Sequence, residues 1–387
     1  MIDVDVAIVG AGPAGSAAAS VLARKGYAVA LIDKKDFPRE KLCGDFINPN
    51  NLALFRELGV EEEIFAAPHR RMTGFRITAV SGAAAEARFS RRNRGETFGL
   101  AIRRALLDRI LLEQARRLGA LVQTGCRIER LDRDERGWRL EAGGGESWRA
   151  RFLIGADGRN SWVAAQIGAD SAALSGRAVG FQLRLKEKFH GSEHRTRDDD
   201  AIAIHLFPGG YAGVASTGDG AMTLGLAIDK RALPRARVKE FLVSERLTQN
   251  PFLRRIIRRS EPGALRSVYP VYFHRRRSFT DAALLVGDAA RVTEPISGEG
   301  VYFALQSGML AANTLDRALK RGDGSANFLR SYEQACARVF RSRVMLNSLL
   351  RFAVYRPALL NRLIAWSAKD NRLLGALVDA VCAPALR

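Results

Sequence analysis

Short apolar runs and a longer amphipathic stretch alternate at the start of the chain. Residues 4–9 form a run rich in β-branched side chains, which is typical of a buried strand. An Ala- and Leu-rich stretch follows and ends at Gly26, a residue that often terminates a helix. Residues 27–32 give a second apolar run. The pattern therefore predicts a strand, a helix and a second strand in close succession.

Two later regions alternate apolar and polar side chains residue by residue. Residues 75–80 and 201–206 are examples, and a period of two predicts strands with one buried face. Toward the end of the chain, residues 325–387 have a helical pattern that Pro357 and Pro384 interrupt. We therefore expect an insert of half-buried strands in the middle of the chain and helices at its end.

A glycine-rich turn, G-A-G-P-A-G at residues 10–15, stands between the first strand and the helix. Gly10 would permit a tight turn, Gly12 would let a pyrophosphate approach the backbone, and Gly15 would let helix and strand pack closely. The helix N-terminus would offer free N–H groups to phosphates. Asp33 follows the second strand, where it would accept hydrogen bonds from ribose hydroxyls. This order predicts a dinucleotide site, and the alternative is an accidental glycine-rich turn.

NAD and FAD both use this unit, and two distant segments distinguish between them. Residues 151–161 run from a predicted strand into Asp157-Gly158, and residues 283–290 run into Gly287-Asp288, before a loop at 295–300. In this order the three segments resemble the FAD signature of the p-hydroxybenzoate hydroxylase-like flavoproteins. The resemblance implies FAD, with Asp288 at its ribityl chain and the 295–300 loop beside the isoalloxazine. A helix N-terminus there would stabilise negative charge on reduced flavin.

Further matches indicate one branch of these flavoproteins. Residues 39–44, R-E-K-L-C-G, resemble the R-x-K-x-C-G motif of the geranylgeranyl reductase-like branch, and residues 287–308 are similar to it as well. Arg39 and Lys41 would neutralise phosphates or reduced flavin, or else belong to a solvated run of charges. Arg103 matches a family arginine near the flavin phosphates. The motifs and the resemblance together imply these cofactor-binding residues: Gly10, Gly12, Pro13, Ala14, Gly15, Asp33, Lys34, Arg39, Cys43, Gly44, Arg103, Ile128, Asp157, Gly158, Gly287, Asp288, Pro295, Gly298, Gly300 and Val301.

The resemblance implies an α/β fold, in which a Rossmann-type FAD-binding domain carries an inserted antiparallel-sheet substrate domain and C-terminal helices. We expect the FAD-binding domain at 1–70, 98–175 and 278–325. The substrate-binding domain would comprise 71–97 and 176–277, with its sheet packed over the flavin, and the C-terminal helical segment 326–387. No second strand–GxGxxG–helix unit occurs in the sequence. NAD(P)H is therefore expected to bind only transiently, or a separate reductase would be needed.

The chain departs from three sub-groups of this superfamily. Flavin halogenases carry a W-x-W-x-I-P segment, and none of the four Trp is paired in this way, so halogenation is disfavoured. Hydroxylases close to the type member carry Asn and Asp where residues 302–307 read Y-F-A-L-Q-S. Isoprenoid reductases carry Y-x-W-x-F-P, whereas residues 207–216 keep P-G-G-Y without the corresponding Trp, Phe and Pro. We expect these changes to reshape the substrate chamber.

Four residues are candidates for catalysis: Cys43, Asp45, His205 and Tyr211. The resemblance places the Cys43 sulfur near the flavin or substrate, although a free Cys is commonly a small buried apolar residue. Asp45 would donate a proton or bond to FAD, or be only a turn residue. His205 would deprotonate a phenol, or be a satisfied structural histidine, and Tyr211 would line the pocket. The four Cys form no CxxC pair, so no metal site is predicted.

The charge is strongly basic, with 61 Lys+Arg against 41 Asp+Glu and a formal net charge of +20. The arginine clusters are scattered and lack interleaved aromatic residues, which argues against nucleic-acid binding. The remaining partners are a hydrophobic small-molecule substrate and either an acidic carrier protein or an anionic membrane surface. The N-terminus lacks a basic signal-peptide region and no long uncharged apolar run follows. We therefore expect a cytoplasmic protein, with peripheral membrane contact as an alternative.

These observations predict an FAD-dependent oxidoreductase. The leading hypothesis is a monooxygenase of secondary metabolism that uses NAD(P)H and O₂ to oxygenate a hydrophobic aromatic or polyketide-like molecule. The first alternative is a flavin-dependent C=C reductase of an isoprenoid or lipid-like substrate. The second is a flavoprotein that acts on a substrate presented by a carrier protein or a membrane. In each case the flavin carries the chemistry and the protein supplies orientation and electrostatics.

Overall fold

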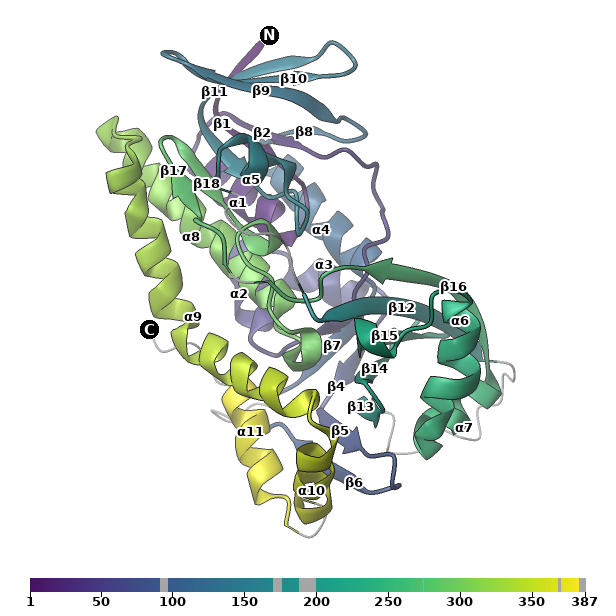
Figure 1. Cartoon of the computed structure of the whole chain (residues 1–387). Coiled ribbons are helices and arrows are strands. Elements are labelled where there is room, and N and C mark those ends of the chain that lie inside the picture. Colours follow the sequence, from purple (N-terminus) through teal and green to yellow (C-terminus); the bar gives the residue numbers. More distant parts are fainter. Residues whose placement is uncertain (91–96, 170–175, 188–199, 274, 368–369, 383–387) are drawn as a thin grey trace.

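A computed structural model describes residues 1–90, 97–169, 176–187, 200–273, 275–367 and 370–382. Parts of the predicted domain segments, namely 91–96, 170–175, 188–199, residue 274, 368–369 and 383–387, lie outside the described residues. Two large sheets lie one above the other in Figure 1, and the C-terminal helices run along the side of both. The described chain has mixed α/β architecture, as the sequence predicted.

The first sheet is built around parallel strands from distant parts of the sequence. Its order is β17-β18-β11-β1-β2-β8, with β10 paired to β11 and β9 paired to β10. The strands are β1 (Ile2–Val9), β2 (Val29–Ile32), β8 (Leu121–Gln123), β9 (Ile128–Asp134), β10 (Gly137–Ala142), β11 (Ser147–Gly155), β17 (Phe279–Thr280) and β18 (Ala283–Leu285). β11 and β18 join β1 in parallel, so the carboxyl ends of all three predicted motif strands meet at one edge.

Helices cover this first sheet and a small third sheet. α1 packs against both α4 and α8, and the buried side chains of these helices join the cores of the half of the molecule that is built on the first sheet. The helices are α1 (Pro13–Arg24), α2 (Asn51–Leu58), α3 (Glu61–Ala66), α4 (Arg104–Arg117), α5 (Trp162–Gln166) and α8 (Gly300–Arg321). The third sheet has the order β3-β7-β4, with strands β3 (Phe46–Ile47), β7 (Gly99–Ile102) and β4 (His69–Met72).

The second large sheet comes from the two regions of alternating residues. Its order is β16-β12-β15-β14-β13-β5-β6. The strands are β5 (Gly74–Thr78), β6 (Ala84–Arg88), β12 (Ala178–Glu187), β13 (Ala201–Phe207), β14 (Gly210–Ser216), β15 (Ala221–Asp229) and β16 (Ser260–Val268). All neighbours are antiparallel except β5 and β13, which pair in parallel. This one pair differs from the purely antiparallel insert that we expected.

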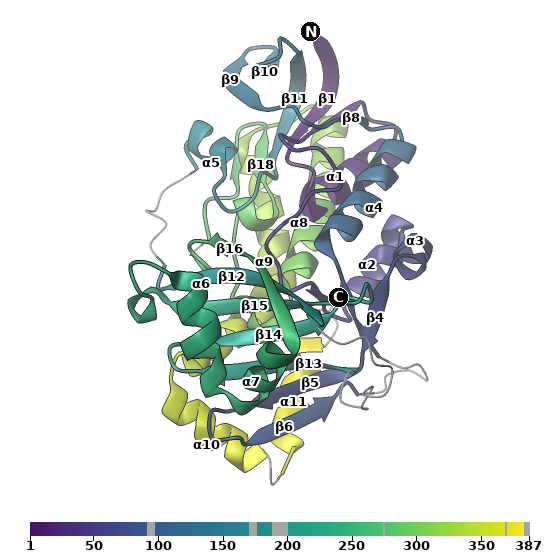
Figure 2. The same ribbon diagram turned by 90° about the vertical axis from the view of Figure 1, so that its right-hand side faces the viewer.

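The alternation along these strands gives the second sheet two distinct faces. The inner face carries Gln182, Tyr211 and Thr223, whose side chains contact groups of the half that is built on the first sheet. The outer face carries apolar side chains such as Phe181 and Leu224, which pack with residues of α6 (Val238–Glu240) and α7 (Pro251–Arg259). Figure 2 shows α6 and α7 lying over this outer face.

Three helices end the described chain: α9 (Ala326–Val354), α10 (Pro357–Ser367) and α11 (Arg372–Cys382). The Ser325 hydroxyl caps α9 by accepting a hydrogen bond from the Phe328 N–H at 3.2 Å. α9 packs along α8 and then continues past the second sheet, where α10 and α11 pack against β6 (Figure 1). Within the described ranges, no helix combines the length and apolarity needed to cross a membrane.

Candidate functional site

The glycine-rich turn brings three segments into close contact at the end of β1. Gly10 has a φ of +108°, and a Cβ there would lie 2.3 Å from the Ala156 carbonyl oxygen. A Cβ on Gly15 would lie 1.9 Å from the Gly10 oxygen, so only glycine lets α1 approach β1 this closely. The Asp33 carboxylate accepts a hydrogen bond from the Ala11 N–H at 2.8 Å. The carboxylate therefore also fixes the turn.

A cluster of cations faces this turn. An Arg39 guanidinium nitrogen lies 3.4 Å from the position that a Cβ on Gly12 would occupy, and the Lys41 Nζ is equally close to that position on Gly158. Arg39 pairs with Asp108 at 3.2 Å and with Asp33 at 3.7 Å. Burial lowers the pKa of Lys41, and the neighbouring positive charges of Arg104, Arg39 and Arg159 lower it further.

This cluster provides a test of whether a diphosphate-containing cofactor fits the site. Within the described residues, no side chain forms a hydrogen bond or ion pair with the half-buried Lys41, although the charge of Asp288 favours its protonated form. Buried cations are costly unless an anion compensates them. A diphosphate beside Gly12 and Gly158 would provide that charge, and the N-terminus of α1 would provide N–H donors. The residues present therefore fit FAD.

The segment 43–45 connects this half of the molecule to the inner face of the second sheet. The Cys43 carbonyl accepts a hydrogen bond from Gln182 at 2.9 Å. Asp45 is buried, and its backbone adopts the left-handed conformation with a φ of +56°. Its carboxylate accepts hydrogen bonds from the Thr223 hydroxyl at 2.7 Å and from the Arg104 N–H at 3.1 Å. Asp45 thus joins the two halves and is more than a turn residue.

Ionisation in this segment is governed mainly by burial. Burial raises the pKa of the Asp45 carboxyl, while the hydrogen bonds from Thr223 and Arg104 oppose the rise. Burial also raises the pKa of the Cys43 thiol, against the nearby positive charge of Arg104. A thiol with a raised pKa is a weak nucleophile at neutral pH. This favours a packing contribution for the Cys43 sulfur.

Tyr211 and Glu294 form a buried acid pair on the inner face. The Tyr211 hydroxyl donates to a Glu294 carboxylate oxygen at 2.6 Å, and both residues are at most 4% exposed. Burial raises the pKa of both groups. Glu294 directly precedes the 295–300 loop, so the pair adjoins the segment expected beside the isoalloxazine. Glu294 is not among the site residues predicted from the sequence; its position just before the Pro295 motif was the available signal.

Helix α9 holds the 295–300 loop in place. Asn347 accepts a hydrogen bond from the Glu294 N–H at 3.0 Å and donates to the Ser297 hydroxyl at 2.7 Å. Arg343 forms a buried ion pair with Glu299. Gly298 has a φ of +65°, and a Cβ there would lie 2.3 Å from the Phe46 ring. Gly300 and Val301 begin α8, so the free N–H groups at the N-terminus of this helix lie at the end of the 295–300 loop.

His205 lies away from these residues. Its Nδ1 is 2.7 Å from the Thr78 hydroxyl, and its ring stacks on Phe252 of α7 with 6.3 Å between centroids. Both contacts lie on the outer face, whereas Tyr211 is on the inner face. Burial lowers the pKa of His205 to about 4, with the charge of Arg76 adding to the effect. The structure therefore does not bring His205 together with Cys43, Asp45 and Tyr211.

The other predicted cofactor residues have varied surroundings. The Asp157 carboxylate accepts from the Ser161 hydroxyl at 2.5 Å and from the Val163 N–H at 3.0 Å, contacts that support the start of α5. Asp288 pairs with Arg159 at 3.8 Å. Arg103 pairs with Glu40 and, at 3.6 Å, with Asp219, so its side chain joins a surface ion-pair network. Pro13 and Ala14 begin α1, Lys34 is exposed, and Ile128 is buried at the start of β9.

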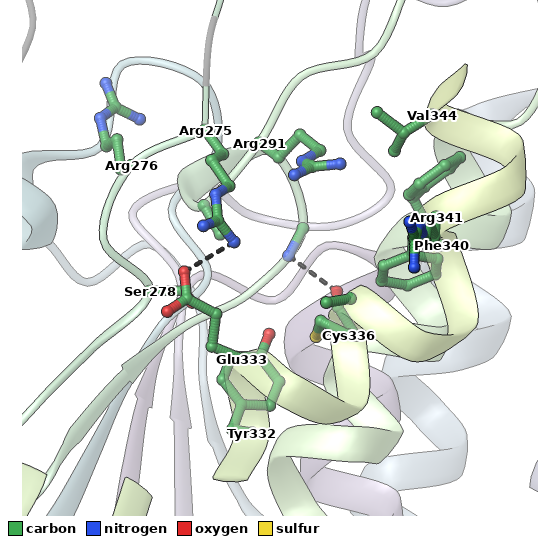
Figure 3. Close-up of a pocket in the computed structure, with 15 residues that line it drawn as sticks. Arg275, Arg276, Ser278, Arg291, Tyr332, Glu333, Cys336, Phe340, Arg341 and Val344 are labelled. Carbon is green, nitrogen blue, oxygen red and sulfur yellow. Dashed lines mark hydrogen bonds and ion pairs between the residues drawn. The ribbon is translucent and has the colours of Figure 1, made fainter. Parts of the chain in front are cut away.

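A separate cavity of about 260 Å³ lies between α8, α9 and residues 275–291. Figure 3 shows the Arg275–Glu333 ion pair, 2.8 Å long, beside it. Gly287 is the only predicted cofactor residue among the lining residues, and its N–H donates to the Ser307 hydroxyl at 2.9 Å. Burial raises the pKa of Cys336 in this cavity to about 12, so its thiol is protonated at neutral pH.

Comparison with known proteins defines the class first. A family model described as an FAD binding domain matches residues 3–193 and 264–347. Together with the cation cluster and the Gly10–Gly15 turn, this match shows an FAD-dependent oxidoreductase. The chain belongs to the FAD binding domain family, within the geranylgeranyl reductase-like branch of the p-hydroxybenzoate hydroxylase-like flavoproteins. The predicted family and fold class are confirmed.

Individual relatives give the same picture. A digeranylgeranylglycerophospholipid reductase of Methanothrix thermoacetophila is 30% identical over 342 residues, which cover 85% of this chain and 82% of that protein. A menaquinone reductase of Mycobacterium tuberculosis is 30% identical over 330 residues, covering 81% and 76%. Both relatives are named as reductases. The two names differ in the substrate, so they do not define the substrate of this chain.

Solved structures share the fold. A geranylgeranyl bacteriochlorophyll reductase-like protein of Thermoplasma acidophilum has a TM-score of 0.76 and 22% identity, with coverage of 100% of this chain and 93% of that one. A flavin-dependent halogenase has a TM-score of 0.74 and 24% identity, and the match covers 88% of this chain but only 63% of the halogenase chain. At these identities the likeness shows the fold alone.

Proposed function

We propose that the protein is a flavin-dependent reductase that saturates C=C bonds in a lipid with polyprenyl chains. The observation that carries this proposal is the buried Tyr211–Glu294 pair with its 2.6 Å hydrogen bond. Saturating a C=C bond requires one hydride and one proton, and reduced FAD is the group that supplies the hydride. An acid must hold the proton until it is needed, and burial raises the pKa of the Glu294 carboxyl, so this acid keeps its proton to a higher pH than an exposed glutamate would.

The chain's own residues supply the remaining requirements. Glu294 holds the proton, and Tyr211 keeps the carboxyl oriented through its hydroxyl. Apolar residues next to this pair exclude water: Ile202, Ile204, Leu206 and Ala227 of the second sheet, with Ile296, belong to the same core cluster as Tyr211. Such water-poor surroundings would suit a hydrocarbon chain and would strengthen electrostatic interactions near this pair.

The relatives support the same substrate class. The two proteins with 30% identity are named for reduction of a digeranylgeranylglycerophospholipid and of menaquinone. Digeranylgeranyl lipids carry unsaturated isoprenoid chains, and menaquinone is a lipid-soluble quinone that carries such a chain. The proposal ranks reduction above oxygenation, the reverse of the order that the sequence motifs alone favoured. NAD(P)H remains the proposed reductant of FAD, bound only during that step.

Monooxygenation of a hydrophobic molecule is the second candidate. It is favoured by Gly213 and Ala215, which share the side of β14 that Tyr211 occupies and leave room for a bulkier ring system. It ranks second because its predicted general base, His205, contacts Thr78 and α7 on the outer face. A phenol bound at the inner face would need another base for activation.

Product analysis under two atmospheres tests the proposal. The dithionite-reduced protein is mixed with a detergent-dispersed digeranylgeranyl ether lipid, either without O₂ or in air, and products are weighed by mass spectrometry. We expect addition of two hydrogens per double bond without O₂. A product that gains an oxygen atom only in air, with no hydrogenated lipid in either arm, would contradict reduction and favour monooxygenation. Menaquinone in place of the ether lipid distinguishes the two lipid classes.

A further inference from the structure

One side of the second half of α9 presents large apolar side chains to solvent. Met345, Leu349 and Phe352 are 65%, 61% and 54% exposed. Spacings of four and three residues place them on one side of the helix. Ten large apolar side chains are exposed in the described ranges, and five of them belong to α9, α10 and α11. This concentration indicates an interaction surface, since singly scattered exposed residues need no explanation.

Arginines extend this apolar row at both ends. Arg338 and Arg341 precede Met345 on the same side of α9, and Arg356 follows Phe352 just beyond the helix end. All three arginines are exposed, and the Arg356 guanidinium lies 3.5 Å from the Phe352 ring centroid. We call these six residues the outer stripe: Arg338, Arg341, Met345, Leu349, Phe352 and Arg356.

The sequence around the outer stripe is unusually one-sided in charge. Residues 334–369 contain seven Lys or Arg and no Asp or Glu. The opposite side of the same helix faces the interior, where Arg343 and Asn347 contact residues of the 295–300 loop. The exposed apolar residues therefore have no part in that internal packing.

We propose that the outer stripe docks on an anionic lipid bilayer. Its apolar side chains would enter the boundary between headgroups and acyl chains, while its arginines would bind lipid phosphates. The three arginines of the outer stripe contribute to the excess of positive charge, for which FAD, with only two phosphates, does not account. Only the purpose of docking rests on the proposed function: docking would bring the protein to the bilayer in which a polyprenyl lipid substrate is dissolved.

Charge decides between the bilayer and two other occupants. A second copy would pair its own stripe with this one, and any such pairing sets arginines near arginines, which disfavours association. An acidic carrier protein would satisfy the arginines and would leave Met345, Leu349 and Phe352 without a role. An anionic bilayer meets both requirements, because it offers negative headgroups beside an apolar interior.

Vesicle co-sedimentation of the full FAD-loaded protein tests the docking. We expect binding to vesicles of equimolar phosphatidylglycerol and phosphatidylcholine, and much weaker binding to pure phosphatidylcholine. The double variant Leu349→Gln with Phe352→Gln should bind anionic vesicles at least about tenfold more weakly, because it removes two of the apolar anchors. Leu121→Gln is the matched control, since Leu121 is 42% exposed on β8 at the other end of the molecule.

A second pair of variants tests the charge. Arg338→Gln with Arg341→Gln should weaken binding to anionic vesicles, and raising the salt concentration should abolish the difference from the parent protein. Arg130→Gln with Arg136→Gln, exposed arginines of the β9–β10 hairpin region, is the control and should bind as the parent does. These substitutions are on the surface, so each variant should retain its FAD spectrum.

Four results would overturn the docking proposal. The first three are failure of the parent protein to bind anionic vesicles, unchanged binding by the Leu349/Phe352 double variant, and a dimer in solution that this variant dissociates while no vesicle binding occurs. Binding of an acyl carrier protein that depends on Arg338 and Arg341 but not on Leu349, with no vesicle binding, would also overturn it. Vesicle binding needs no turnover, so docking without reduction of detergent-dispersed lipid would contradict the proposed function alone.

Discussion

The two faces of the second sheet differ in what their polar side chains contact. On the inner face, Tyr211, Thr223 and Gln182 reach across to Glu294, Asp45 and the Cys43 carbonyl. On the outer face, His205 contacts Thr78 and Phe252 within its own domain. Leu206 of β13 is the direct partner of Tyr211 in the sheet. His205 is the residue before Leu206, so its side chain points to the opposite face. A shift of one position along a strand reverses the face and changes the chemistry available.

The largest expected effect comes from the inner face. Glu294→Gln keeps the shape of the side chain but removes the proton that Glu294 would donate. We expect the rate of C=C reduction to fall by about 10²- to 10⁴-fold, with FAD content unchanged. Glu333→Gln, a part-buried glutamate of α9, is the control and should retain the parent rate. An unchanged rate in Glu294→Gln would remove Glu294 from the mechanism.

The pH dependence gives a further test of the same residue. Burial raises the pKa of Glu294, so the protonated acid persists to a higher pH than an exposed glutamate would allow. Activity that needs this proton should therefore be present at lower pH and decline as the pH rises through the raised pKa. The declining limb should be missing from the pH profile of Glu294→Gln.

The next effect belongs to the outer face and concerns stability. The pKa of His205 is lowered from 6.5 to about 4 in the folded protein, so between these values only the unfolded chain is protonated there. The neutral, buried imidazole of His205 therefore contributes fully to the free energy of unfolding above pH 6.5. This contribution is lost as the pH falls, and the loss reaches about 3 kcal/mol at pH 4. His205→Leu should remove this part of the pH dependence in urea unfolding while keeping the reductase rate per folded molecule. Identical pH curves for parent and variant would contradict the lowered pKa of His205 in the folded protein.

The smallest effect concerns the contact between the two halves. Thr223→Val removes the 2.7 Å hydrogen bond to Asp45 with little change in volume. We expect the free energy of unfolding to fall by about 1 kcal/mol, because a buried carboxyl loses one donor. Thr248→Val, whose hydroxyl bonds only within an exposed turn, should leave stability unchanged. Equal stability of the two variants would show that Thr223 contributes nothing across the interface.

Local patterns were sufficient to predict the FAD-binding half. Gly10, Gly15 and Asp33 are close in sequence, and their tasks follow from backbone geometry that any such turn must satisfy. The alternation near residues 75 and 201 likewise predicted strands, because a half-buried strand repeats every two residues. These interactions are short in range and need no knowledge of the whole fold.

The catalytic candidates could not be predicted in the same way. Which face His205 occupies depends on the register of β13 against β5 and β14, and a parallel β5–β13 pair is not visible in either strand alone. Glu294 gains its importance from Tyr211, a residue 83 positions away. Arg103 matched a family pattern, yet its neighbour Arg104 is the arginine buried beside Asp45. Such pairings arise only when distant segments meet.

The single helix α9 has one further consequence. Arg343 and Asn347 hold the 295–300 loop from one side of it, and Met345 and Leu349 are exposed on the other, so the two sets are separated by no more than a helix diameter, about 10 Å. Any binding event that displaces this helix must also move the loop. Thermodynamic reciprocity then applies: whatever factor an external partner contributes to the affinity for the cofactor, the cofactor contributes to the affinity for that partner.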